Sequence, residues 1–191
     1  MVARLQEALC ALATDGALRD RLRAEGAPAL RGFSLDEGDL QALVGLPPES
    51  IDRYARSLLT KRTDELARAI PLSRRVAPSL PGRYRALLAG SPSPLDDSVL
   101  GPGLREALRL LGPLRRQLDA DEGEAPWAGD LLSLEVLRAA SRVDGAVRVA
   151  RLGHDLRPVL VDLARGLIPT EVARASMLVR CDAAGLRWRA A

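Results

Sequence analysis

The stretch AVRVARLGHDLRPVLVDLARG, residues 146–166, decides the fold of the last quarter of this chain. Apolar and charged side chains alternate at its start, so that Val147 and Val149 share one face and Arg148 lies on the other. A period of two is typical of a half-buried β-strand. Asp155 then stands at a helix N-cap position, and apolar residues at helical spacing follow it. The stretch therefore predicts a strand followed directly by a helix.

A second stretch, SMLVRCDAAGLRWRA at residues 176–190, has the same alternation on both sides of residues 182–185. A four-residue connection that ends in glycine is typical of a β-hairpin. With the preceding strand, the hairpin predicts a three-stranded antiparallel sheet. A sheet this small has an edge strand with unpaired N–H and C=O groups, where an extended peptide can add a further strand.

The first ninety residues predict helices only. One helix should end near Thr14, the next should be capped by Asp15, and a capping box at residues 34–37 should start a third. The strongest apolar stripe predicts a fourth helix over residues 51–70, which Pro71 would end. Two short helices are expected at 73–79 and 82–88.

Proline and glycine divide the middle of the chain. Residues 91–94, Ser-Pro-Ser-Pro, mark the clearest break, and a helix over 104–118 should be interrupted or kinked at Gly112-Pro113. Pro126 suits the first position of a helix that runs to about Val143.

The fold class expected from these elements is α+β and mostly helical. An N-terminal helical bundle would be followed by a small winged-helix-like domain that carries the three-stranded antiparallel sheet. We expect a helical docking domain at 1–90, a linker and connecting helix at 91–126, and a peptide-recognition domain at 127–191.

The composition argues against several classes of protein. The two cysteines are isolated and the chain shows no secretory or membrane-spanning apolar run, which indicates a reducing, cytoplasmic location without membrane contact. The single histidine, His154, lies in a strand-to-helix turn, and no His, Cys or carboxylate cluster has metal-ligand spacing. No phosphate-binding loop or nucleophile elbow is present. We therefore expect neither an enzyme nor a cofactor.

Charge is unevenly distributed along the chain. Residues 145–191 hold eight arginines and four acidic residues, whereas residues 91–144 carry a net charge of −4. A basic terminal segment attracts an acidic partner, either a peptide or a nucleic acid. The alternative is an arginine-rich surface that only contacts solvent.

Four segments of the N-terminal part resemble a known helical domain: residues 14–19 (TDGALR), 40–43 (LQAL), 54–62 (YARSLLTKR) and 70–72 (IPL). The domain accompanies multinuclear non-heme iron oxidative enzymes that modify ribosomally made peptides, and the methanobactin-type partner proteins contain it. The match covers roughly residues 5–88. Arg151-Leu-Gly-His-Asp155, followed by a helix and a hairpin, is similar to the winged-helix-like peptide recognition element of those partner proteins.

The resemblance implies a non-catalytic subunit. It would bind the leader of a precursor peptide and present the peptide to an iron oxidative enzyme in a heterocomplex, with the iron ligands on the enzyme. The peptide-binding surface would use the strand at 147–151 and the helix after Asp155. Its candidate residues are Arg148, Val149, Arg151, Arg157 and Leu160, with the arginines contacting acidic leader residues. The hairpin strand that ends at Trp188 is the rival edge.

The main alternative is a winged-helix DNA-binding protein. A short recognition helix would then cover Thr170 to Arg174, with Arg174 as its only base-reading side chain and Glu171 facing phosphates unfavourably. Nucleic acid is accordingly not the expected partner. A third possibility is a scaffold whose helices dock a partner and whose sheet binds nothing.

Overall fold

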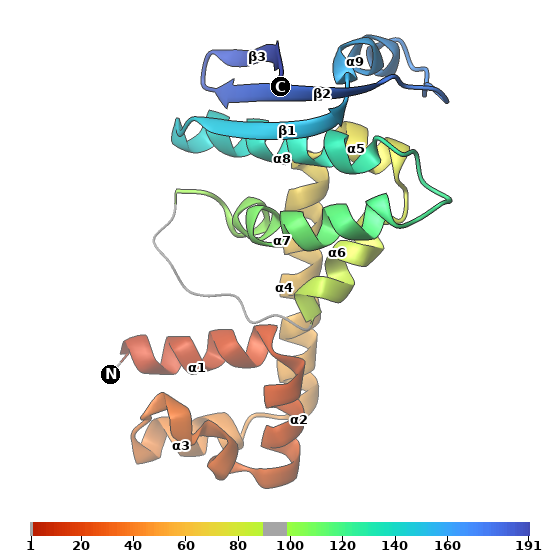
Figure 1. Ribbon diagram of the computed structural model, residues 1–191. Helices are drawn as coiled ribbons and strands as arrows, with labels where there is room; N and C mark the ends of the chain where they lie inside the picture. The colour runs from red at the N-terminus through yellow and green to blue at the C-terminus, as the bar shows by residue number, and fades with distance from the viewer. Residues whose placement is uncertain (1, 90–98) are drawn as a thin grey trace. The chain divides into compact units, whose positions relative to one another are not determined.

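The computed structural model describes residues 2–89 and 99–191. It is an α+β, mostly helical structure with one small antiparallel sheet, which confirms the expected fold class (Figure 1). Contacts between Cα atoms divide the chain into two compact units, Met1–Arg62 with Arg85–Asp97 and Thr63–Tyr84 with Ser98–Ala191. The predicted break at residues 91–94 lies outside the described residues, and the predicted domain limits stay a prediction.

The first unit is built from short helices that close on a small apolar core. Its elements are α1 (Val2–Thr14), α2 (Gly16–Glu25), the 3₁₀ helix η1 (Ala27–Phe33), α3 (Glu37–Val44) and the first part of α4 (Pro48–Ala69). Asp15 caps α2 as predicted, because its side chain accepts a hydrogen bond of 3.1 Å from the Leu18 N–H. The buried core consists of Ala8, Leu12, Leu18, Leu30 and Leu43.

The start of α3 differs from the prediction. Ser34 does not cap this helix: it has a φ of 48° and follows the last residue of η1. Asp36 is the cap, and its carboxylate accepts a 2.8 Å hydrogen bond from the Asp39 N–H. The local sequence pattern missed this because η1 extends through Phe33 and shifts the entry into α3 by two residues.

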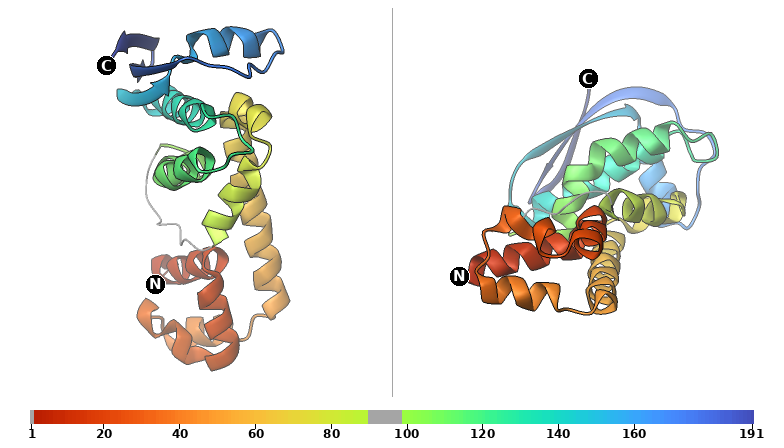
Figure 2. Two further views of the ribbon diagram at one scale, coloured as in Figure 1. Left: turned by 45° about the vertical axis from the view of Figure 1, so that its right-hand side comes forward. Right: turned by 90° about the horizontal axis from the view of Figure 1, so that it is seen from below.

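The second unit is organised around α8 (Ala128–Asp144), which is buried on almost every side. It packs against α5 (Pro71–Val76), α7 (Pro102–Asp119) and the sheet, so that it lies between α7 and the strands (Figures 1 and 2). The unit also contains residues of α6 (Leu80–Ala89) and the whole of α9 (Leu156–Ala164). A helix buried on all faces needs apolar residues all round, and Leu131, Leu132, Leu134, Val136 and Ala140 supply them.

Two proline-based predictions concern these helices. Pro126 does not begin α8, which starts at Ala128 with Trp127 as its N-cap residue. The helix α7 is not interrupted at Pro113 and continues to Asp119. A proline inside a helix costs about 3 kcal/mol. Burial of the apolar face of α7 offsets this cost. That face consists of Leu104, Ala107, Leu110, Leu114 and Leu118.

The sheet has the strand order β1–β2–β3, and both pairs are antiparallel. Its strands are β1 (Arg148–His154), β2 (Arg174–Asp182) and β3 (Gly185–Ala190). Only Ala183 and Ala184 form the turn between β2 and β3, because Asp182 and Gly185 already pair across the ladder. The Asp182 carboxylate holds this turn by accepting hydrogen bonds from the Ala184 and Gly185 N–H groups at 3.0 and 3.2 Å.

The helix that the DNA-binding alternative requires at Thr170 to Arg174 is absent. Residues 171–173 have no regular structure, and Arg174 is the first residue of β2. The pairing of His154 with Arg174 and the 3.3 Å hydrogen bond from the Asp155 N–H to the Ala173 carbonyl hold this segment extended. Tertiary pairing with β1 therefore replaces the local helix.

Candidate peptide-binding surface

The two faces of the sheet carry different side chains because alternate residues of each strand point to opposite sides. The face toward α8 is apolar and buried, and its members are Ala150, Leu152, Met177, Val179 and Cys181. Burial raises the pKa of the Cys181 thiol, which keeps this group in its neutral form at the bottom of the sheet. The other side, here called the open face, consists of Val149, Arg151, Leu178, Arg180, Arg187 and Arg189.

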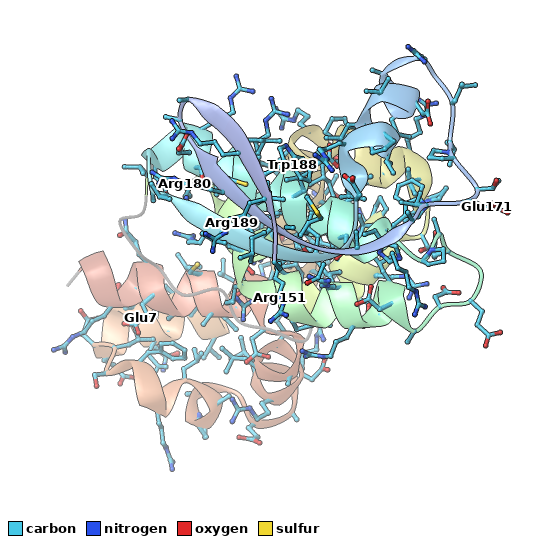
Figure 3. All side chains as sticks on the ribbon, turned by 45° about the horizontal axis from the view of Figure 1, so that its top comes forward. Glu7, Arg151, Glu171, Arg180, Trp188 and Arg189 are labelled. Carbon is cyan, nitrogen blue, oxygen red and sulfur yellow. The ribbon has the colours of Figure 1, made fainter. Side chains whose placement is uncertain are left out.

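The open face is basic and accessible. All four of its arginines are exposed, and the Val149 side chain is 60% exposed. Within the described part of the chain, the ion pair between Arg180 Nε and Asp182 Oδ2 at 3.3 Å is the only one that an arginine of this face makes. Figure 3 shows that Arg151, Arg180 and Arg189 come from three different strands, with the acidic Glu171 well away from them. The face therefore has a net positive charge.

A groove of about 310 Å³ lies on this side of the sheet. Its lining combines an apolar floor with guanidinium groups and consists of Val149, Leu178, Arg180, Arg187, Trp188 and Arg189. Arg180 stands directly opposite Arg187 in the ladder, and Leu178 stands opposite Arg189. Like charges directly opposite each other destabilise a sheet by about 0.2–1 kcal/mol. An anionic ligand would relieve this repulsion.

The outer edge of β3 has unpaired backbone groups. Ala191 N–H donates a 2.9 Å hydrogen bond to the Ser176 carbonyl, which fixes the phase of the β2–β3 ladder. In an antiparallel pair, alternate residues direct N–H and C=O toward the partner strand and the residues between them direct both groups away. The outward-directed residues are therefore Leu186, Trp188 and Ala190. No strand within residues 2–89 and 99–191 pairs with this edge.

The outer edge of β1 is partly occupied by side chains from the helices. Arg115 of α7 donates a 3.1 Å hydrogen bond from Nη1 to the Arg151 carbonyl, and the Gly153 N–H donates to Asp130 Oδ2 of α8 at 2.8 Å. The same Asp130 carboxylate, which is 3% exposed, contacts Arg115 Nη2 and lies 2.8 Å from His154 Nδ1. The only histidine of the chain is thus part of a network that fixes the end of β1.

The structure brings together two of the five predicted site residues. Val149 and Arg151 share the open face. Arg157 is exposed on α9 and pairs with Asp155 at 2.6 Å, and this hydrogen bond lowers the pKa of the Asp155 carboxyl. Leu160 lines a different groove, between α8, α9 and the end of α4, which also contains Glu135 and Arg138.

Arg148 does not belong to the open face. Its guanidinium group makes two hydrogen bonds to the Asp144 carboxylate at the end of α8, at 2.7 and 2.5 Å. This interaction, together with a hydrogen bond from the Ala146 N–H, lowers the pKa of Asp144 to about 2. Arg148 therefore anchors the start of β1 on α8 and lies on the face opposite Val149, where the alternation placed it.

Four residues of the open face were missed from the sequence. They are Leu178, Arg180, Arg187 and Arg189. The alternation of apolar and basic residues in both hairpin strands was the signal that could have identified them. It places Arg187 and Arg189 together on one face of the strand and Trp188 on the opposite face. The pattern does not predict the register of β2 with β1 and β3, which decides the residues that lie side by side on this face.

The described residues contain neither a candidate metal site nor a candidate membrane-spanning helix. No group of three or more His, Cys, Asp or Glu side chains there is arranged to hold a metal ion. Nor do the described helices include one with the length and apolar character needed to cross a membrane.

Comparisons with known proteins assign no family to the chain. No protein-family model matches the sequence. No curated protein and no solved structure matches it either.

Proposed function

We propose that this protein is a non-catalytic partner that binds the leader of a ribosomally synthesised precursor peptide and presents the peptide to a multinuclear iron oxidative enzyme. The observation that carries the proposal is the basic, grooved open face beside the unpaired edge of β3. An extended peptide gains main-chain hydrogen bonds at such an edge, and its side chains reach the adjoining groove.

Energetics favour a peptide with both apolar and acidic residues. A net hydrogen bond contributes about 1 kcal/mol, so main-chain pairing alone gives weak binding. Burial of apolar surface against the partly buried Trp188 adds about 25 cal/mol per Å². The guanidinium groups at the rim of the groove add charge complementarity, which speeds association and excludes basic peptides.

The enzyme part of the proposal rests on the N-terminal resemblance. In this scheme the helical segment at residues 5–88 docks the iron oxidative enzyme in the cytoplasm, and the catalytic iron ligands belong to that enzyme. The protein contributes binding and positioning of the peptide and no chemical step of its own.

Co-expression tests the complex, and calorimetry tests the peptide site. We expect the full chain to co-elute in size exclusion with an iron oxidative enzyme encoded next to it. We also expect saturable binding of the leader of a neighbouring precursor in isothermal titration calorimetry. Separate elution of the two proteins would contradict the docking role, and absence of heat with the leader would contradict the peptide role.

DNA binding is the second candidate, and the basic hairpin is the observation in its favour. The absence of a helix at residues 170–174 removes the element that would enter the major groove. Four arginines on a sheet face permit non-specific contact with phosphates, which weakens steeply with salt. Electrophoretic mobility shifts at about 150 mM salt discriminate, since tight and sequence-dependent retention would favour DNA.

A further inference from the structure

We infer that the β3 edge selects a peptide strand in which acidic and apolar residues alternate. The inference deepens the proposed function and rests on it. Its basis is that the side chains of β3 themselves alternate between Arg187 and Arg189 on the open face and Leu186, Trp188 and Ala190 on the other side.

The phase of the ladder fixes which residues of an added strand lie on each side. Leu186, Trp188 and Ala190 direct their backbone groups outward, so they form the hydrogen-bonded pairs with an added antiparallel strand. Directly paired residues in a sheet have their side chains on the same face. Peptide residues opposite Leu186, Trp188 and Ala190 therefore lie on the apolar side.

Apolar residues suit that side because the layer beneath β3 is incompletely covered. Leu186 and Trp188 are only partly buried and Ala190 is exposed, whereas Met177, Val179 and Cys181 of the neighbouring strand are buried. An added strand with apolar residues in these positions would extend the layer by one strand and reduce the exposed area of the Trp188 ring.

The intervening peptide residues lie beside Arg187 and Arg189. The structure gives neither arginine a carboxylate partner among the described residues, and the open face has one acidic neighbour, Asp182, which pairs with Arg180. Acidic residues at two positions, two apart in the peptide, match this spacing. The same positions repel lysine or arginine, which gives discrimination as well as affinity.

The β1 edge does not offer an equivalent site. Arg115 and Asp130 already bond to the Arg151 carbonyl and the Gly153 N–H, so an added strand would have to displace both side chains. The structure therefore assigns the alternating peptide to β3.

The test uses three fluorescein-labelled nine-residue peptides with the full chain. One alternates glutamate with valine or leucine, one has the same residues in two blocks, and one has lysine in place of glutamate. In fluorescence anisotropy at about 150 mM salt, we expect the alternating peptide to bind at least ten-fold tighter than the block peptide and the lysine peptide not to bind. Equal affinity for the first two peptides would overturn the inference.

Three variants locate the site. R187Q/R189Q should weaken binding of the alternating peptide at least ten-fold, while R157Q, which removes an arginine from α9, should leave it unchanged. A190P removes an outward N–H and should also weaken binding, without a change in the thermal unfolding midpoint. Unchanged binding in both R187Q/R189Q and A190P would place the peptide elsewhere.

The precursor leader separates the two levels of the proposal. A leader that binds the wild type and R187Q/R189Q equally well would refute the alternating pattern and leave the proposed function standing. Failure of the leader and all three synthetic peptides to bind the wild type would refute both.

Discussion

The two outer edges of the sheet, at β1 and at β3, belong to strands of similar length but are treated differently by the rest of the second unit. The β1 edge is attached at both ends, through Arg148 to Asp144 at its start and through Gly153 to Asp130 at its end. The β3 edge has no such attachment within the described residues. An exposed edge is a liability that proteins usually cover. The difference indicates that β1 serves the fold, whereas β3 is left open at the edge where we propose that the peptide binds.

Substitution of Asp130 should have the largest effect on the attachment of the β1 edge, measured as a loss of stability. D130A removes the acceptor of the Gly153 N–H and leaves Arg115 and His154 without their shared carboxylate. Loss of one partner from such a buried network costs about 3 kcal/mol in the free energy of unfolding. Urea unfolding followed by circular dichroism measures the loss.

D119A is the matched control for this variant. Asp119 also contacts Arg115, at 3.5 Å, but its side chain is 46% exposed, so its removal should cost less than about 1 kcal/mol. If D130A and D119A lower stability equally, the network does not hold the β1 edge.

A charge reversal at Arg187, which lies opposite Arg180, should have opposite effects on stability and on peptide binding. R187E converts a like-charged cross-strand pair into an attractive one and is expected to stabilise the sheet by about 0.5 kcal/mol. The same change places a carboxylate beside the proposed acidic ligand and should abolish its binding. Thermal unfolding and peptide titration on one sample measure both effects, and a variant that gains stability and still binds would show that the open face is not the site.

Acid should weaken the attachment of β1 to α8. The pKa of Asp144 is lowered to about 2 from its ordinary value of 3.8, chiefly by the hydrogen bonds from Arg148. A lowered carboxyl pKa means that its stabilising contribution is complete above about pH 4 and is lost as the pH falls through 2. The thermal midpoint of the wild type should therefore fall more steeply between pH 4 and pH 2 than that of R148Q. Parallel curves for the two proteins would show that this ion pair does not anchor the strand.

The elements of the sheet were predictable from local pattern, and its pairing was not. The alternation at residues 146–152 and 176–190 identified the strands and the hairpin within two residues of their observed bounds. It also placed Val149 and Arg148 on opposite faces correctly. The side chains of β2 and β3 that share a face with Val149 are decided by the register between β1 and β2, which are far apart in sequence.

Whether an arginine stabilises the fold or is exposed on the surface also depends on residues from other elements of the fold. Arg148 and Arg151 lie on opposite faces of β1, and the position of α8 beneath β1 directs Arg148 to Asp144. Arg115 and Asp130, which occupy the β1 edge, lie outside the segment that the alternation describes. The strand at Arg174, where the DNA-binding alternative required a helix, likewise follows from pairing with His154.

The positive charge on β3 also governs how copies of this protein meet one another. Two antiparallel β3 strands joined edge to edge would bring Arg187 and Arg189 of both copies onto one side of a six-stranded sheet. Their mutual repulsion disfavours this self-association, and its range shortens from about 10 Å at 0.1 M salt to about 3 Å at 1 M. The same two side chains therefore disfavour a dimer joined at this edge in dilute salt, and any such dimer should appear first at high salt.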